Sequence, residues 1–124
     1  MSEQLPERGE LWWVGLDPTV GVEVRKTRPA VVLTARRFQT LPIRIVIPLV
    51  TWQERFNSHA NKVFVPATPG NGLSTDSAAD VTQVRSAAIE RFGSRIGVLD
   101  AGLVSEIAGR LAMAVGFDTR TLGR

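Results

Sequence analysis

The chain has 124 residues, carries 15 lysines and arginines against 12 aspartates and glutamates, and contains no cysteine. This length is typical of one domain, so residues 1–124 are expected to form a single unit with loose tails at 1–7 and 118–124. Without cysteine there is no disulfide framework, thiolate zinc site or cysteine nucleophile. The polar N-terminus and the lack of any apolar run near ~20 residues predict a cytoplasmic protein without membrane contact.

The polar residues restrict the chemistry further. The single histidine, His59, excludes a two-histidine ribonuclease mechanism and a histidine-rich metal site. The acidic residues do not cluster at metal-ligand spacing, so we expect no metal ion and no other cofactor. The net charge of +3 is mildly basic, but Arg25, Lys26 and Arg28 share one loop, and such a cluster is compatible with nucleic-acid binding.

The first half of the chain contains three strand-like runs. Residues 11–16 are rich in aromatic and branched side chains, which favour strands. Residues 30–34 form a short continuous apolar run, typical of a buried strand, which begins just after Pro29. Residues 43–51 predict a third strand. Pro48 within it indicates a sheet edge or a bulge, because proline cannot donate to a ladder.

Shorter elements follow. Residues 52–60 are polar and predict a short helix or loop, residues 63–65 predict a short strand, and residues 68–73 predict a turn with proline and glycine. Residues 80–86 alternate between polar and apolar with a period of two, which is the pattern of a half-buried strand. Residues 95–99 continue this pattern as a last strand.

The final element has a different period. Asp100 is a suitable N-cap for a helix, and Gly116 is a suitable residue to end it. The apolar positions between them recur at spacings of three and four, so they share one helix face: Leu103, Val104, Ile107, Leu111 and Val115. Many short strands followed by one helix predict a mainly β fold, a small and strongly bent antiparallel barrel with a helix packed on it.

The loop between the first two strands is the most unusual segment. Residues 17–32 contain an Asp-Pro pair, a glycine, one acid and three bases, and Arg28 and Pro29 precede a buried strand. Chain topology alone does not require a cationic loop here. Because proline fixes the neighbouring backbone, the Arg28 guanidinium is expected at the rim of the sheet, facing whatever the protein binds.

Five motifs occur in order along the chain. They are the Arg-Gly-Glu-Leu-Trp-Trp-Val start at 8–14, the loop at 17–32, the strand end at 47–51, Asp-Ser at 76–77 with Gln-Val-Arg at 83–85, and the strand at 95–99 with the helix after it. In this order and at this spacing they resemble the MazF/PemK family, the toxins of bacterial toxin–antitoxin pairs. The resemblance covers most of the chain, from residue 8 to residue 116.

The resemblance implies an SH3-like, CcdB/MazF-like barrel that forms a homodimer. Trp12 and Trp13 are expected to be core and dimer-interface residues and not platforms for RNA. The resemblance implies an mRNA interferase, a metal-independent endoribonuclease that cleaves single-stranded RNA at short sequences. It also implies a cognate antitoxin protein that covers the active groove. In this family the catalytic pair is the arginine of the Arg-Pro motif and the threonine that closes the third strand, which are Arg28 and Thr51 here.

In the reaction that the resemblance implies, the 2′-hydroxyl of the substrate attacks the phosphorus and leaves 2′,3′-cyclic phosphate and 5′-hydroxyl ends. A guanidinium suits this chemistry because it is planar, permanently charged and offers several donors to phosphate oxygens. It is a poor general base, so Glu23 is a candidate for support in proton transfer. The candidate RNA-binding residues are Arg25, Lys26, Thr27, Trp52, Ser77 and Gln83.

Two alternatives remain open. One is a non-enzymatic toxin on the same fold, like the gyrase-targeting CcdB proteins. That class does not require the Arg-Pro and threonine pair, which this chain retains. The other is a degenerate relative that binds RNA or an antitoxin-like partner without turnover, since intact motifs do not prove catalysis.

Overall fold

The computed structural model describes residues 4–16, 21 and 26–118. Seven strands are present in this part: β1 (Glu10–Gly15), β2 (Thr27–Val32), β3 (Ile43–Thr51), β4 (Lys62–Val65), β5 (Ser77–Asp80), β6 (Arg85–Ala88) and β7 (Phe92–Val98). The helix α1 (Ala101–Ala114) follows them. Short 3₁₀ turns lie between some of the strands: η1 (Arg36–Phe38), η2 (Glu54–Ser58), η3 (Val81–Gln83) and η4 (Ile89–Arg91).

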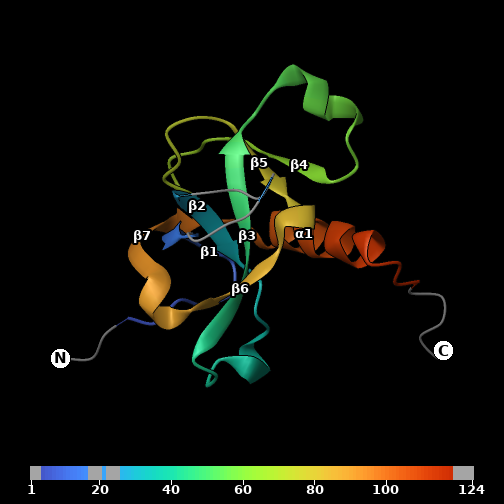
Figure 1. The fold of residues 1–124 in the computed structure, drawn as a ribbon. Helices are drawn as coiled ribbons and strands as arrows, with labels where there is room; N and C mark the ends of the chain where they lie inside the picture. Colours follow the sequence, from blue (N-terminus) through green and yellow to red (C-terminus); the bar gives the residue numbers. More distant parts are fainter. Residues whose placement is uncertain (1–3, 17–20, 22–25, 119–124) are drawn as a thin grey trace.

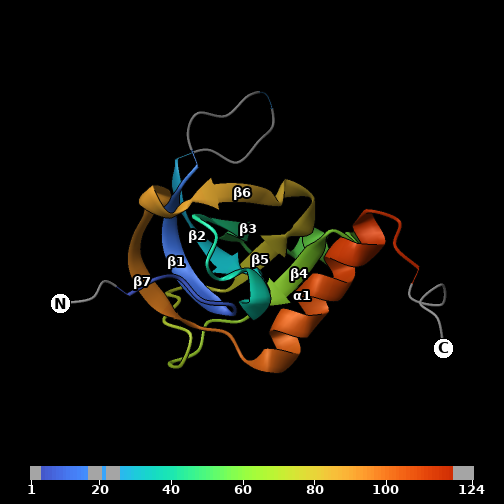
Figure 2. The ribbon, with the colours of Figure 1, turned by 90° about the horizontal axis from the view of Figure 1, so that it is seen from below.

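The strands form one bent sheet, and every strand pair is antiparallel. The order across the sheet is β4-β5-β3-β2-β1-β7, with β6 paired to β3 as well. α1 lies against β4 and η3 at one side of the sheet (Figures 1 and 2). The predicted mainly β fold with a C-terminal helix is therefore confirmed. Within the described residues, no helix is both long enough and apolar enough to span a membrane.

The apolar core is divided between the two faces of the sheet. Val31 belongs to a larger cluster that α1 covers with Val104 and Ile107. Ala30 and Val32 belong to a second cluster on the opposite face, since neighbouring residues of a strand point to opposite sides. β2 is therefore buried on both faces at its C-terminal end. This explains why its sequence is continuously apolar and does not alternate.

Pro48 lies in a central strand, so the predicted sheet edge is wrong. β3 pairs β2 on one side, and β5 and β6 on the other. The N–H of Leu33 donates to the carbonyl oxygen of Ile45 at 2.9 Å, so the odd-numbered residues of β3 bond to β2. The nitrogen of Pro48 therefore faces the other side, where no ladder hydrogen bond is required of it.

On that side the partner of β3 is interrupted, and residues 80–86 do not form the single strand that their alternation predicted. Leu49 faces Ala79 in β5, whereas Val46 faces Arg85 in β6. Three residues along β3 therefore correspond to six residues of the partner, and the extra residues form η3. The partner of β3 is therefore interrupted opposite Pro48 by a 3₁₀ turn, while β3 itself keeps a regular register without the bulge that Pro48 indicated.

Asp80 begins this turn. Its Oδ1 accepts hydrogen bonds from the N–H of Thr82 at 3.2 Å and from the Thr82 hydroxyl at 2.8 Å, and so caps η3. Such local side-chain bonds compete with a strand ladder, which is why the period of two was misleading here. The Asp80 carboxylate also forms an ion pair with Lys62 of β4 at 3.5 Å, and this pair ties the turn to the neighbouring strand.

α1 has the predicted ends. The Oδ1 of Asp100 accepts a hydrogen bond from the N–H of Leu103 at 2.9 Å, and Gly116 has a φ of +78° just after the helix. Four of the five predicted apolar positions pack in the larger core cluster. Val115 does not, because it lies beyond the last helical residue and is exposed.

Several boundaries differ from the sequence prediction. β2 begins at Thr27, three residues earlier than predicted, so Pro29 lies inside the strand. β7 begins at Phe92 and not at residue 95, and β5 was not predicted as a separate strand. The N-terminal segment is anchored at Pro6, which is buried. Its carbonyl oxygen accepts hydrogen bonds from Gln39 and Arg44, at 2.9 and 2.8 Å.

Candidate functional site

A cavity opens where β2 and β3 separate. The two strands pair only as far as Ala30 and Pro48. Beyond this point β2 continues along β1 as far as Thr27, and β3 continues along β5 as far as Thr51. The ends of two neighbouring strands therefore diverge, and a cavity of about 350 Å³ lies between them.

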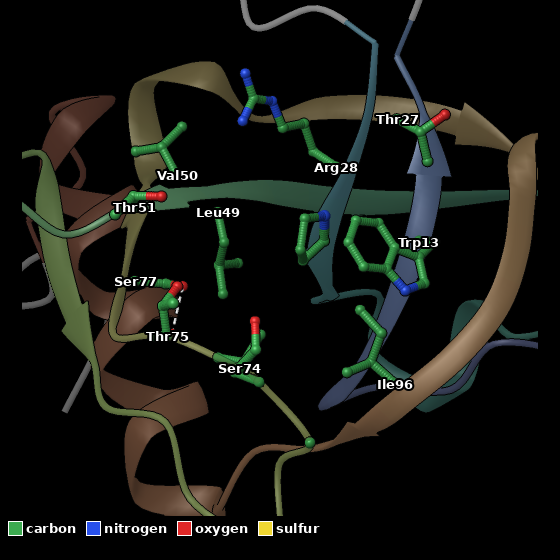
Figure 3. Close-up of a pocket in the computed structure, with 13 residues that line it drawn as sticks. Trp13, Thr27, Arg28, Leu49, Val50, Thr51, Ser74, Thr75, Ser77 and Ile96 are labelled. Atoms are coloured by element: carbon green, nitrogen blue, oxygen red, sulfur yellow. Dashed lines mark hydrogen bonds between the residues drawn. The ribbon is translucent and has the colours of Figure 1, made fainter.

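Arg28 and Thr51 lie on the two separating strands at the rim of this cavity, and both are exposed (Figure 3). Among the lining residues in the described part of the chain, Arg28 is the one charged residue. Figure 3 shows a hydroxyl-bearing side and an apolar side, with Leu49 between them. The hydroxyl side includes Thr51, Ser77, Thr75 and Ser74, and the apolar side includes Trp13 and Ile96.

The hydroxyl side depends on a close backbone approach between the turn after β4 and β7. A Cβ atom at Gly72 would lie 2.3 Å from the carbonyl oxygen of Ile96, and one at Gly97 would lie 2.3 Å from the carbonyl oxygen of Asn71. Gly72 also has a φ of +74°, which favours glycine. Both positions therefore require glycine, because a larger residue would prevent the turn from approaching β7 this closely.

A buried asparagine fixes the same turn. The Oδ1 of Asn71 accepts hydrogen bonds from the N–H groups of Thr68 and Leu73, at 3.1 and 3.0 Å. Its Nδ2 donates to the carbonyl oxygen of Pro66 at 2.7 Å. The polar groups of this buried side chain are thus satisfied within the turn, and they hold the segment that leads into the cavity wall.

The end of the wall is attached to β3 and β4. The Oδ1 of Asp76 accepts a hydrogen bond from the N–H of Ala67 at 2.9 Å, and its carbonyl oxygen accepts one from the N–H of Trp52 at 3.0 Å. Beside it, the Ser77 hydroxyl donates to the carbonyl oxygen of Thr75 at 3.2 Å (Figure 3). The hydroxyl groups of the wall are therefore presented by a segment bound at both of its ends.

Two arginines hold the other side of the site, at the base of the loop between β1 and β2. The N–H of Leu16 donates to the carbonyl oxygen of Lys26 at 2.9 Å, and Lys26 has a φ of +68°, which is unusual for a residue with a side chain. Arg85 donates from Nη1 to the Leu16 carbonyl oxygen at 2.7 Å, and Arg91 donates from Nη1 to the Gly15 carbonyl oxygen at 3.2 Å. The end of β1 is thus fixed next to the strand that contains Arg28.

The structure brings together some of the predicted site residues. Those that line the cavity are Arg28, Thr51, Thr27 and Ser77. The predicted residues that lie elsewhere in the described structure are Lys26, Trp52 and Gln83. The remaining two predicted residues, Glu23 and Arg25, lie outside the described residues.

Trp52 belongs to a different aromatic cluster. Its ring centroid lies 4.9 Å from that of Phe64 and 5.7 Å from that of Phe56, both edge to face. These rings line a second cavity of about 460 Å³ between η2, β4 and α1. The ammonium of Lys62 lies 4.7 Å from the Phe56 ring centroid, and His59 lies against the same ring at 5.7 Å. The Trp52 ring therefore has a packing role of its own, against Phe56 and Phe64, which does not depend on a ligand.

Sequence reasoning missed two parts of the cavity. Trp13 was expected in the core or at a dimer interface; in the described structure it is 42% exposed and not in the core, and it lines the apolar side of the cavity. Ser74 and Thr75 were not singled out, although a run of hydroxyl residues directly after a glycine turn is a visible signal. Trp12, by contrast, is buried as expected.

This arrangement suits an anionic ligand. A guanidinium and several hydroxyl groups converge on one cavity, and no carboxylate of the described residues lines it. Such donors bind phosphate oxygens well, since they place positive charge and directed hydrogen bonds together. Within the described ranges, no three His, Asp or Glu side chains are grouped to hold a metal ion.

The chain is similar in sequence and in fold to known proteins. The chain is 33% identical over 107 residues to "Endoribonuclease PemK" of Escherichia coli, covering 86% of this chain and 79% of the relative. It is 34% identical over 104 residues to "Endoribonuclease MazF9" of Mycobacterium tuberculosis, covering 81% and 87%. The crystal structure of MazF from Deinococcus radiodurans shares the fold, with a TM-score of 0.78 at 21% identity over 93% of this chain and all of that one.

The model of one protein family matches residues 7–115, which is nearly the whole chain. This family is described as the PemK-like, MazF-like toxin of type II toxin–antitoxin systems. The match includes each strand of the described sheet, the helix α1 and every residue that lines the cavity. The chain therefore belongs to the PemK-like, MazF-like family of toxins.

Proposed function

We propose that the protein is an endoribonuclease toxin that cleaves single-stranded RNA, such as mRNA, at short sequences. The observation that supports this most is that Arg28 and Thr51 line one cavity, on two strands that separate at that point. They match the catalytic pair that the family resemblance implies. The names of the two curated relatives, both endoribonucleases, support the same activity.

In the proposed mechanism, the 2′-hydroxyl of the substrate attacks the adjacent phosphorus, and the 5′-oxygen leaves. The products are a 2′,3′-cyclic phosphate and a 5′-hydroxyl. The guanidinium of Arg28 stabilises the negative charge that develops on the phosphoryl oxygens, and the Thr51 hydroxyl donates one further hydrogen bond. Because both groups come from a rigid sheet, they also align the attacking oxygen.

Proton transfer requires another group, because a guanidinium does not give up its proton at physiological pH. Glu23 is the proposed support, since it belongs to the same loop in the sequence. Replacing it in Glu23→Gln is expected to change the pH–rate profile, and an unchanged profile would remove Glu23 from the mechanism. Arg25, Lys26 and Gln83 are proposed to bind flanking parts of the RNA.

The protein is also proposed to pair with a cognate antitoxin and to form a homodimer. A mycobacterial endoribonuclease was solved in complex with its cognate antitoxin, and it shares this fold with a TM-score of 0.69 at 16% identity. Exposed apolar residues on β3 and the segment before it support association with a second copy: Phe38, Leu41, Ile43 and Ile45. Sedimentation equilibrium of wild type and Ile45→Lys tests the dimer, which should weaken in the variant.

The activity is tested by incubating a mixed-sequence single-stranded RNA with the protein in the presence of EDTA. Wild type should produce discrete cuts with cyclic-phosphate ends, and Arg28→Ala should not. Arg110→Ala is the matched control, because Arg110 lies in α1 and lines the other cavity, and it should cleave like wild type. If folded wild type free of antitoxin leaves the RNA intact, a gyrase-targeting toxin or a binding-only relative becomes the better description.

A further inference from the structure

Two adjacent tryptophans of β1 have different environments. Trp12 is buried, its Nε1 donates to the Oε1 of Glu10 at 2.9 Å, and its ring meets Phe92 edge to face at 5.9 Å. Trp13 is 42% exposed, and Figure 3 shows its ring at the cavity. Within residues 4–16, 21 and 26–118, Trp13 packs against no other aromatic ring. An apolar, planar surface is thus left open inside the cavity.

The opposite wall offers hydrogen bonds. Ser74 and Thr75 are exposed, and the Ser77 hydroxyl donates to the Thr75 carbonyl oxygen, so its remaining lone pairs can accept. The close contact of Gly72 with Ile96 holds this wall at a fixed distance from the apolar side. The cavity therefore combines a planar apolar face with a row of groups that both donate and accept hydrogen bonds.

A nucleobase has matching chemistry, because its faces are apolar and its edge is polar. Bases of single-stranded nucleic acids stack on exposed aromatic side chains, and their edges are read by hydrogen bonds. Arg28 and Thr51 line the same cavity, on the ends of the two separating strands (Figure 3). A phosphate bound to Arg28 would therefore lie beside the cavity that Trp13 also lines.

We propose that this cavity is a base-binding subsite for one nucleotide next to the scissile phosphate, with the base stacked on Trp13 and its edge facing Ser74 and Thr75. The inference rests on the proposed ribonuclease activity and specifies how that activity selects its substrate. It assigns the stacking role to Trp13. Trp52 is the less suitable platform for this base, because its ring already packs edge to face with two phenylalanines in the other cavity.

The test measures kcat/KM with a synthetic RNA that contains one cleavage site, and with the same RNA in which single nucleotides near the cut are abasic. At one position next to the scissile phosphate, removal of the base should lower kcat/KM of wild type about 10- to 100-fold. Trp13→Ala should lower kcat/KM of the intact RNA by a similar factor. On the abasic RNA, Trp13→Ala should cause no more than about a twofold further loss, because the two changes remove the same contact.

Two variants make the comparison specific. Trp13→Phe retains an aromatic face and should keep most of the activity. Trp52→Ala removes the tryptophan of the second cavity, and its effect should be independent of the abasic position that couples to Trp13. Circular dichroism and thermal unfolding of each variant show whether it is folded, and Trp13→Phe keeps the test valid if Trp13→Ala does not fold.

Two outcomes would overturn the proposal while leaving the ribonuclease activity intact. In the first, Trp13→Ala and each abasic substitution act independently, which would mean that Trp13 contacts no base. In the second, Trp13→Ala lowers cleavage of intact and abasic RNA equally and also dissociates the protein, which would mean that a second copy covers the indole. Absence of cleavage by wild type, in contrast, would count against the proposed function itself.

The hydroxyl wall has a separate readout. A library of RNAs randomised around the cut is cleaved by wild type and by the double variant Ser74→Ala/Thr75→Val, and the cut sites are sequenced. The double variant should lose base preference at the same single position that the abasic experiment identifies, with cleavage retained. Unchanged preference at that position would remove the proposed reading of the base edge.

Discussion

The Nη1 of Arg85 lies 2.7 Å from the carbonyl oxygen of Leu16, and this hydrogen bond joins residues 69 positions apart in the sequence. Leu16 is fully buried, and its own N–H closes the loop base by donating to Lys26. Arg85 therefore anchors the end of β1 that pairs with the Arg28 end of β2, since Val14 of β1 faces Arg28. The guanidinium acts through the backbone and does not line the cavity.

Arg85→Ala should lower kcat about 10-fold or more, because loss of this anchor lets Arg28 move relative to the phosphate. KM should change less, since other contacts hold the RNA. Arg95→Ala is the matched control. Arg95 pairs with Glu10 at 3.0 Å at the other end of β1, so its loss should affect stability more than kcat. Equal kcat values for both variants would show that Arg85 has no special role in positioning.

The sequence predicted most of the sheet because its strands have strong local signals. Ile43–Thr51 is a long run of branched residues, and its predicted bounds match β3 at both ends. The misread segment, residues 80–86, has an equally clear alternation. There the local hydrogen bonds of Asp80, and the proline on the strand opposite, divert the chain into η3. The effect of the proline depends on which strand lies opposite residues 80–86, and a local sequence pattern gives no information about strand pairing.

The residues of the candidate site also fall into two groups: those predicted by a local motif, and those brought to the cavity only by the fold. Arg28 and Thr51 could be found from motifs, because each motif is a short stretch of sequence. The cavity they share exists because β2 and β3 diverge and because the turn at Gly72 packs against β7. Both relationships join segments that are far apart in the chain. For this reason Trp13 could be recognised as a lining residue only in the folded structure, whereas the hydroxyl run at Ser74 and Thr75 was visible in the sequence but did not show which cavity it would line.

Gly97→Ala should lower the free energy of unfolding by about 1–3 kcal/mol, because the added Cβ would overlap the backbone carbonyl of Asn71. Gly109→Ala is the control. Gly109 lies inside α1 with open space where its Cβ would be, so this change should raise the free energy of unfolding by up to about 1 kcal/mol. Urea denaturation measures both values, and a neutral Gly97→Ala would disprove the tight contact.

Asp100→Ala should lower the free energy of unfolding by about 1 kcal/mol, since it removes the side-chain acceptor for the N–H of Leu103 at the start of α1. Asp100→Ser keeps an acceptor at this position and should retain most of the stability. Because no residue of α1 lines the cavity, neither variant should change kcat. Thermal unfolding and RNA cleavage of the two variants separate these effects, and similar unfolding for both would argue against the cap.

Thr51→Val should lower kcat about 100- to 1,000-fold, because valine has nearly the same shape but has no hydroxyl to stabilise the developing charge. Thr51→Ser restores the hydroxyl and should recover activity to within about 10-fold of wild type. Thr51 is exposed at the end of β3, so neither change should alter stability by more than about 0.5 kcal/mol. If the valine variant cleaves single-stranded RNA as fast as the serine variant, the hydroxyl is not part of the reaction, and Arg28 must stabilise the transition state with other donors of the cavity wall.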